Sequence, residues 1–209
     1  MRCGLLYSGG KDSTLAALVL DPLFDVTLVT ATFGISGDDR EGDGTADANV
    51  VANGRAAAES VGFDFETIDL DRSVAEAAVE RMVSDGYPRN GIQQVHEHAV
   101  ETIAAADPFD AVADGTRRDD RAPTVDRPLA QSVEDRFDID YLAPLGGFGR
   151  DAIDALVADR LRVETGPSET IPKADYETEL RALMRAEYGD DAVAAVFPEH
   201  TQSRVVGTK

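Results

Sequence analysis

The sequence predicts an α/β protein built on a doubly wound, mainly parallel sheet of five strands with helices on both faces. Short aliphatic or β-branched runs alternate along the chain with segments of helical periodicity, which is the pattern of parallel strands joined by crossover helices. The first run ends in two glycines and leads directly into a helical segment. A length of 209 residues with 43% hydrophobic residues suits one core of ordinary size.

Five segments have the length and composition of strands. They are RCGLLYS, DVTLVTATF, FDFETIDL, FDAVADG and IDYLAPL. Helical patterns lie between and after them, at residues 12–20, 46–61, 73–84, 91–106, 123–136 and 149–160. In a sheet of this kind ligands bind outside the carboxyl ends of the strands. The turns that follow the strands are therefore where a site is expected.

The last part of the chain predicts one more helix and a polar tail. Tyr176, Leu180 and Leu183 fall on one helical face, and the final stretch FPEHTQSRVVGTK is too polar for a core strand. We expect residues 1–165 to form the α/β domain and residues 166–209 to pack on it as a helix and tail.

The charge balance indicates an acidic, solvated surface. Asp and Glu number 40 against 20 Lys and Arg, for a net charge of -20, and the acids are spread along the whole chain. Only Lys11, Lys173 and Lys209 are lysines, a composition typical of proteins of salt-loving archaea. Such a charge argues against nucleic acid as a partner, although in concentrated salt screening shortens the reach of surface charges to about 3 Å at 1 M.

The single cysteine and the lack of long apolar stretches exclude several classes. Cys3 cannot form an internal disulfide or a cysteine-based metal site, and we expect it to be a core residue. No stretch is apolar enough for a signal peptide or a membrane span. The sequence therefore predicts a cytoplasmic protein without a membrane partner.

The turn SGGKDS, residues 8–13, lies at the first strand-to-helix junction and predicts an anion site, because a helix N-terminus presents unpaired N–H groups. A Walker A loop is excluded, since Leu5 stands where its first glycine belongs and Asp12 where its hydroxyl belongs. The dinucleotide fingerprint cannot be aligned to this turn either.

Ser-Gly-Gly-Lys-Asp-Ser resembles the PP-loop of the ATP pyrophosphatase superfamily, whose fold is Rossmann-like and of the HUP class, and the chain is similar in length to its small stand-alone archaeal members. The resemblance implies that the turn wraps the β,γ-pyrophosphate of ATP, that a substrate oxygen attacks the α-phosphate, and that pyrophosphate leaves. Glycines let the backbone approach the phosphates, hydroxyls donate, the lysine neutralises charge, and the aspartate lies on the magnesium side. These roles fall on Ser8, Gly9, Gly10, Lys11, Asp12 and Ser13.

A second segment, ADGTRRDDRAPT at residues 113–124, follows the fourth strand and is expected beside the first turn. It looks like the Gly-Thr turn with acidic residues of the PP-loop enzymes. We expect Gly115 and Thr116 to bind ATP, Asp119 and Asp120 to be catalytic together with Lys11 and Asp12, and Asp12 and Asp119 to hold Mg²⁺. Candidates for the acceptor or for phosphate are Arg117, Arg118, Arg121 and Thr124. The alternative is a surface charge run that caps the next helix.

Further candidates follow other strands. The resemblance places adenine at Ala31, Thr32 and Phe33, with Phe33 equally suited to the core. Gly146, Gly147 and Arg150 form a second glycine-rich turn into a helix that could bind an anion. The segment 34–48 is predicted to be a loop.

The tail and the histidines complete the candidates. In the tail, residues 197–207, His200 and Arg204 either fold over the ligands or belong to an exposed terminus. His96 and His98 are two residues apart on a predicted helix, so they point in different directions and do not form a zinc pair.

The resemblance implies an enzyme that uses ATP and Mg²⁺ to adenylylate an acceptor, releasing pyrophosphate and then AMP. The acceptor is left open between tRNA, as in thiolation-type base modification, and a small molecule, and a homodimer is left open too. Thiolases with paired cysteines are excluded, because Cys3 stands alone. The alternative class is a nucleotide-binding module without turnover.

Overall fold

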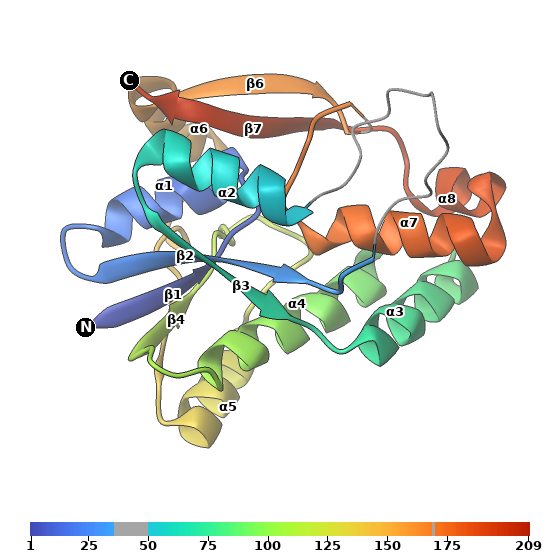
Figure 1. The fold of residues 1–209 in the computed structure, drawn as a ribbon, viewed down its shortest axis with the longest axis horizontal. Coiled ribbons are helices and arrows are strands. Elements are labelled where there is room, and N and C mark those ends of the chain that lie inside the picture. Colours follow the sequence, from blue (N-terminus) through green and yellow to red (C-terminus); the bar gives the residue numbers. More distant parts are fainter. Residues whose placement is uncertain (36–49, 169) are drawn as a thin grey trace.

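A five-stranded parallel sheet with strand order β3-β2-β1-β4-β5 forms the centre of the protein (Figure 1). The computed structural model describes residues 1–35, 50–168 and 170–209. The strands are β1 (Arg2–Leu6), β2 (Asp25–Thr32), β3 (Asp64–Asp69), β4 (Ala111–Ala113) and β5 (Asp140–Leu142). All four neighbouring pairs are parallel, which confirms the predicted doubly wound sheet.

Helices cover both faces of the sheet (Figure 1). On one face lie α1 (Lys11–Leu20), α2 (Val50–Val61) and α6 (Arg150–Arg160), and on the other lie α3 (Arg72–Asp85), α4 (Arg89–Ala104) and α5 (Arg127–Phe137). The helix predicted at residues 123–136 begins later, at α5, because Asp126 caps it by accepting a hydrogen bond from the Leu129 N–H, and Pro128 suits the first turn. Of the predicted loop at residues 34–48, all but the first two residues lie outside the described part of the chain.

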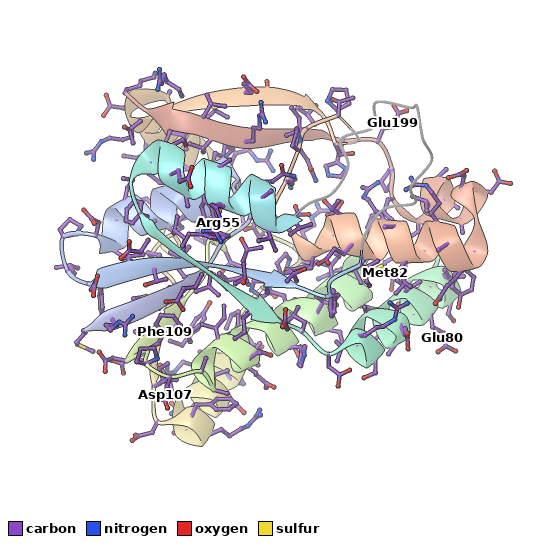
Figure 2. All side chains as sticks on the ribbon, viewed as in Figure 1. Arg55, Glu80, Met82, Asp107, Phe109 and Glu199 are labelled. Carbon is purple, nitrogen blue, oxygen red and sulfur yellow. The ribbon has the colours of Figure 1, made fainter. Side chains whose placement is uncertain are left out.

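The alternation along β1 divides the core into two layers. Cys3 and Leu5 pack on the α1 and α6 side, whereas Leu6 packs on the α3 and α4 side. Burial raises the pKa of the Cys3 thiol to about 12, so this cysteine remains a neutral core residue, as predicted. Met82 of α3 and the partly buried Phe109 belong to the same core layer as Leu6 (Figure 2).

Many of the acidic residues lie on the surface. Glu80 on α3 and Glu199 near the C-terminus are exposed and extend from the ribbon (Figure 2). Together with the net charge of -20, this placement agrees with a solvated acidic surface. No helix in the described ranges is long and apolar enough to cross a membrane.

The C-terminal part adds two helices and a separate two-stranded sheet. The helices are α7 (Tyr176–Tyr188) and α8 (Asp190–Val196), and the strands are β6 (Leu161–Pro167) and β7 (Thr201–Thr208), which pair antiparallel. The tail is thus a strand outside the central sheet, and α8 was not predicted. Strand β6 includes residues 165 and 166, between which the sequence analysis placed the boundary of the α/β domain. The division of the chain into a domain and a tail stays a prediction.

Strand β7 is attached to the first turn of the sheet. The Val205 N–H donates to the Gly9 carbonyl oxygen at 3.0 Å, and the Val205 side chain is buried in the same core layer as Leu161 and Leu5. The next residue, Val206, is only partly buried. The C-terminal strand therefore stabilises the conformation of the glycine turn.

We expect Val205→Ala to lower the free energy of unfolding by about 1–2 kcal/mol, because it deletes buried methyl groups and leaves a cavity. Val206→Ala, on the neighbouring half-exposed position, should lower it less. Urea denaturation of both variants measures the difference. An equal loss in the two variants would show that β7 does not pack on the core through Val205.

Candidate functional site

The site lies at the topological switch point of the sheet. Strands β1 and β4 are neighbours, but the chain leaves β1 toward α1 on one face and leaves β4 toward α5 on the other. In open α/β sheets ligands bind in the crevice outside the strand ends at this point. The two turns that the sequence singled out, residues 8–13 and 113–124, both begin there.

The glycine turn presents the N-terminus of α1 without a cap. Gly9 has φ of +71°, a left-handed conformation that favours glycine. The Ser8 and Ser13 hydroxyl oxygens lie 3.2 Å apart, and the Gly10 N–H donates to the Ser8 hydroxyl at 3.4 Å. Within the described residues no side chain caps α1, so the first N–H groups of this helix can bind an anion.

The turn after β4 packs directly on the glycine turn. A Cβ atom at Gly115 would lie 2.8 Å from the backbone N of Ser13, which explains the glycine at this position. The Arg117 guanidinium lies 3.6 Å from the Asp12 carboxylate. The two turns are therefore neighbours, as their places after adjacent strands predicted.

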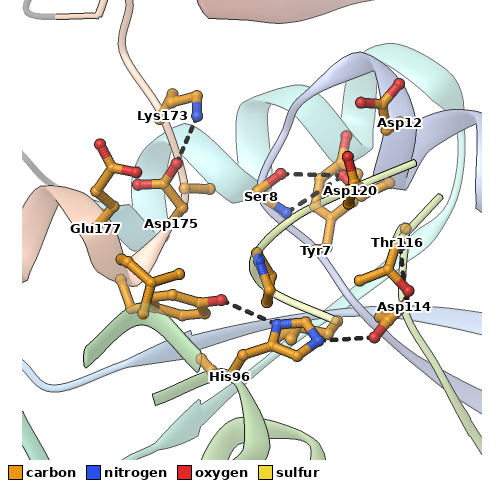
Figure 3. Close-up of a pocket in the computed structure, with 18 residues that line it drawn as sticks. Tyr7, Ser8, Asp12, His96, Asp114, Thr116, Asp120, Lys173, Asp175 and Glu177 are labelled. Atoms are coloured by element: carbon orange, nitrogen blue, oxygen red, sulfur yellow. Dashed lines mark hydrogen bonds and ion pairs between the residues drawn. The ribbon is translucent and has the colours of Figure 1, made fainter. Parts of the chain in front are cut away.

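A pocket of about 240 Å³ opens between these turns and the segment that leads into α7 (Figure 3). Ser8, Asp12 and Ser13 line it from the first turn. The remaining polar lining comes from the end of β1, from α4, from the β4 turn, and from the start of α7 with the segment before it, namely Tyr7, His96, Asp114, Thr116, Asp120, Lys173, Asp175, Tyr176 and Glu177. The volume is slightly below the range of about 300–1,000 Å³ that is usual for ligand pockets, so a nucleotide would extend beyond it.

Four carboxylates that line the pocket form ion pairs with basic side chains. Lys173 contacts Asp175 at 2.7 Å (Figure 3), and both are largely buried. The Lys173 ammonium offsets the burial of Asp175 and holds the pKa of that carboxyl below its usual range. The remaining pairs are Lys11 with Asp12 at 2.8 Å, Arg117 with Asp120 at 2.5 Å, and Arg181 with Glu177 at 2.9 Å.

A buried network forms the floor of the pocket. The Asp114 carboxylate is 1% exposed and accepts hydrogen bonds from His96 Nε2 at 2.7 Å, Tyr141 Oη at 3.0 Å, and the Thr116 N–H and hydroxyl at 2.9 and 2.7 Å. On its other side, His96 Nδ1 lies 3.0 Å from Tyr176 Oη (Figure 3). The network joins α4, the end of β4 and the start of α7.

The network fixes the charge of Asp114. Burial alone would raise the pKa of this carboxyl, but the hydrogen bonds from His96 and Thr116 outweigh it and lower the pKa. Burial raises the pKa of Tyr176 well above its usual value, and the nearby Asp175, Asp114 and Glu177 carboxylates raise it further. Asp114 is therefore ionised, and Tyr176 keeps its proton.

Lys11 and Asp119 do not line the pocket. The Lys11 ammonium points to Asp154 on α6, at 2.9 Å, as well as to Asp12. Asp119 accepts a hydrogen bond from the Arg150 N–H at the start of α6, at 3.1 Å, which lowers its pKa. Of the two consecutive aspartates, Asp119 and Asp120, it is Asp120 that lines the pocket beside the glycine turn.

The residues predicted to hold Mg²⁺ do not form a site on their own. Asp12 lines the pocket, whereas Asp119 is directed to α6. Among the residues that the structure describes, no group of three or more His, Cys, Asp or Glu side chains is arranged to hold a metal ion. Carboxylates are ligands that Mg²⁺ accepts, but it usually keeps waters and phosphate oxygens as well, so these residues suit Mg²⁺ only when it arrives with phosphates.

The end of β2 is occupied by a carboxylate that the sequence analysis missed. Ala31 lines the pocket, but the Thr32 hydroxyl and the Phe33 N–H donate to Glu179 of α7, at 2.8 and 2.9 Å. The Ile35 N–H donates to the same carboxylate at 3.0 Å. Burial raises the pKa of Glu179, against the effect of these hydrogen bonds.

The other phosphate or acceptor candidates lie outside the pocket lining. Arg118 and Arg121 are exposed. Thr124 is held by Gln93 of α4, whose amide bonds to both its backbone N–H and its carbonyl at 2.9 and 2.7 Å. The glycines at 146 and 147 form a turn with the Gly146 N–H donating to Ala143.

The tail candidates are also outside the pocket. The exposed His200 Nδ1 lies 3.1 Å from the Pro198 carbonyl oxygen, and Arg204 forms an ion pair with Glu164 across the β6–β7 sheet at 2.7 Å. The tail contacts the glycine turn through the Val205 backbone, not through these side chains.

Sequence reasoning missed several polar residues of the pocket. Tyr7, Asp114, Lys173, Asp175 and Glu177 were not singled out, Tyr176 was assigned to a core face, and His96 was weighed only as a zinc ligand. A signal was available for one of them, because Asp175 precedes a helical pattern and caps α7 by accepting from the Thr178 N–H. The pairing of His96 with Asp114 joins residues 18 positions apart and has no local signature.

These features define a doubly wound α/β protein with a glycine turn and an ion-paired pocket at its switch point. A family model described as a family of unknown function, DUF7411, matches residues 1–207, and the chain belongs to this family. An uncharacterised protein of Methanocaldococcus jannaschii is 37% identical over 210 residues, covering 100% of this chain and 97% of that protein. The crystal structure of a predicted subunit of tRNA methyltransferase from the same organism is 35% identical and superposes with a TM-score of 0.84, covering 100% of this chain and 98% of the other.

We expect Gly115→Ala to lower the free energy of unfolding by about 1–3 kcal/mol, because the new methyl group overlaps the α1 backbone. Gly147→Ala is the matched control, since a Cβ at that position meets no atom within 4 Å. Urea denaturation compares the two. Equal stability of both variants would mean that the two turns can move apart without cost.

Asp114 should contribute to stability in a pH-dependent way. Its pKa is lower in the folded protein than in the unfolded chain, so its contribution is complete above the unfolded pKa of about 3.9 and is lost as the pH falls through the native pKa. We expect the free energy of unfolding of the wild type to fall more steeply below about pH 4 than that of Asp114→Asn. Parallel curves for the two proteins would contradict an ionised, hydrogen-bonded Asp114.

Proposed function

We propose that the chain is an ATP-dependent enzyme of the PP-loop type, which transfers the adenylyl group of ATP to an acceptor and releases pyrophosphate and then AMP. The observation that carries this proposal is the placement of the Ser8–Ser13 turn. All six residues of the motif lie at the switch point, and the uncapped N-terminus of α1 begins within the motif, at Lys11. A turn of this kind suits the two terminal phosphates of a nucleotide.

The paired charges around the pocket support the same proposal. Lys173 with Asp175 and Arg117 with Asp120 are ion pairs that phosphates and Mg²⁺ could exchange for new partners. The basic side chains would move to the phosphates, and Asp12 and Asp120 would remain for the metal, so Asp120 replaces Asp119 in our proposal. In the part of the chain that the structure describes, every charged side chain of the pocket lining has a partner of opposite charge or a hydrogen-bond partner.

The proposed reaction breaks one bond of ATP. An acceptor oxygen attacks the α-phosphorus, a new oxygen–phosphorus bond forms, and the bond to the α,β-bridging oxygen breaks with its electron pair on pyrophosphate. Mg²⁺ brought with ATP would supply positive charge to the phosphates. The cations nearest to the turn, Lys173, Arg117 and Lys11, would neutralise the charge that develops on the leaving group.

The acceptor that we propose is a group in tRNA. The support is the neighbour of known structure, which is described as a predicted subunit of tRNA methyltransferase. The net charge of -20 opposes direct RNA binding in dilute salt. Concentrated salt, or a second subunit that binds RNA, would remove this obstacle, and a small-molecule acceptor is the outcome to be tested against it.

The test supplies [α-³²P]ATP, Mg²⁺ and tRNA from a strain that lacks the protein, in concentrated KCl. We expect AMP and pyrophosphate to appear only when tRNA is present, and labelled AMP to become attached transiently to the tRNA. AMP formation with a pool of small metabolites but not with tRNA would move the acceptor to the small-molecule class. ADP and inorganic phosphate as products would overturn the proposed reaction.

The three lysines offer a matched comparison. We expect Lys11→Ala and Lys173→Ala each to reduce the rate of AMP formation about 10²–10³-fold, because each removes positive charge beside the leaving group. Lys209→Ala, at the end of β7 and outside the pocket, should retain the wild-type rate. Circular dichroism and urea denaturation verify that the variants are folded. Wild-type rates in both Lys11→Ala and Lys173→Ala would remove these lysines from the mechanism.

A further inference from the structure

Adenylyl transfer to a protonated acceptor needs a base, and the glycine turn does not supply one. An acceptor that attacks through a protonated group must lose that proton as its bond to phosphorus forms. Of the pocket carboxylates, Asp12 and Asp120 are proposed to hold Mg²⁺, and Glu177 is paired with Arg181. Asp175 caps α7 and accepts from the Thr178 N–H and hydroxyl as well as from Lys173. The floor network, in contrast, ends at a tyrosine hydroxyl that lines the pocket.

The direction of the hydrogen bonds in this network follows from Asp114. The ionised carboxylate can only accept, and His96 Nε2 lies 2.7 Å from its Oδ2 atom, so His96 must donate from Nε2. In the neutral imidazole Nδ1 is then an acceptor. In this neutral tautomer Tyr176 Oη, 3.0 Å away, can donate its proton to Nδ1.

Tyr176 is placed so that its oxygen can accept a further proton. Its O–H bond is directed to His96, which leaves the lone pairs of its oxygen for another donor, and the side chain belongs to the pocket lining. Two residues earlier, the Ala174 N–H donates to the Ser8 carbonyl oxygen at 3.1 Å. The backbone that carries Tyr176 is thus fixed relative to the glycine turn, where the phosphates are proposed to bind.

We propose that Tyr176, His96 and Asp114 form a proton relay that takes the proton from the attacking group of the acceptor. This inference rests on the proposed adenylyl transfer. The acceptor's X–H bond breaks as its proton moves to Tyr176 Oη, while the tyrosine proton moves to His96 Nδ1. The resulting imidazolium is stabilised by the Asp114 carboxylate, and after product release the proton returns through Tyr176 to water.

The roles within the relay differ. Tyr176 is the catalytic residue, because it touches the acceptor, whereas His96 and Asp114 are positioning residues that act through it. The raised pKa of Tyr176 disfavours a free tyrosinate, so the two protons move together. Thr116 and Tyr141 donate to Asp114 but lie off the path between acceptor and imidazole.

Tyr176→Phe and Tyr141→Phe separate a relay from a merely structural network. Each variant removes one hydroxyl from the network, but only Tyr176 lines the pocket. With [α-³²P]ATP, Mg²⁺ and tRNA under single-turnover conditions, we expect Tyr176→Phe to reduce AMP formation about 100-fold and Tyr141→Phe to reduce it only a few-fold. Tyr188→Phe, at the exposed end of α7, should match the wild type.

Two further measurements test the path of the proton. The wild type should show a normal solvent deuterium isotope effect on AMP formation, which should disappear in Tyr176→Phe. Nitrogen-15 NMR of the imidazoles, assigned among the three histidines, should show His96 protonated at Nε2 only at neutral pH. Calorimetric titration with MgATP should give the same affinity for Tyr176→Phe and wild type within about threefold, as expected for a residue that acts on the acceptor.

The outcomes distinguish the relay from the proposed function. Equal losses in Tyr176→Phe and Tyr141→Phe, an isotope effect unchanged in Tyr176→Phe, or a proton on His96 Nδ1 would overturn the relay and leave adenylyl transfer standing. Absence of AMP from the wild type with every acceptor would overturn the proposed function, and the relay with it. Loss of ATP affinity in Tyr176→Phe would assign the tyrosine to nucleotide binding and overturn its role toward the acceptor.

Discussion

Two carbonyl groups of the glycine turn hold the C-terminal part of the chain against the sheet. The Ser8 oxygen accepts from the Ala174 N–H at 3.1 Å, and the Gly9 oxygen accepts from the Val205 N–H at 3.0 Å. Gly9 has a left-handed conformation, and its carbonyl is directed to β7. A residue with a Cβ atom adopts this conformation only with strain. Lys173 and Tyr176, on either side of Ala174, reach the pocket because of the first of these hydrogen bonds.

This constraint explains how much of the fold the sequence predicted. The parallel sheet, its five strands and seven of the eight helices in the described residues follow from local periodicity and from the glycines after the first strand. The pairing of β6 with β7 joins segments about 40 residues apart through backbone groups. Backbone hydrogen bonds carry no residue signature, so nothing in the tail predicted its strand or the position of Ala174.

The sequence predicted where the site lies but not which side chains face into it. Two turns after adjacent strands had to meet at one edge of the sheet, and Gly115 against Ser13 shows that they do. Which side chains of these turns face inward depends on their ion pairs. Asp119 caps the start of α6 and Asp120 binds Arg117, although the two are consecutive, and such a choice cannot be derived from composition.

The buried Asp114 is the feature that the fold alone explains least. An ionised carboxylate that is 1% exposed loses its hydration, and several kcal/mol of cost must be offset by its partners. A well-packed apolar residue at the end of β4 would stabilise the sheet as well or better, since buried ion pairs are often neutral or unfavourable relative to such replacements.

The four hydrogen bonds to Asp114 stabilise the charge, but they do not require a histidine as one of the donors, because Tyr141 and Thr116 already supply hydroxyl and N–H groups. His96 differs from these donors in having a second nitrogen, and that nitrogen faces Tyr176 in the pocket lining. The charge of Asp114 is thus connected to the pocket through groups that can exchange protons, and the proposed relay gives an acid at this position a role that a gain in stability does not.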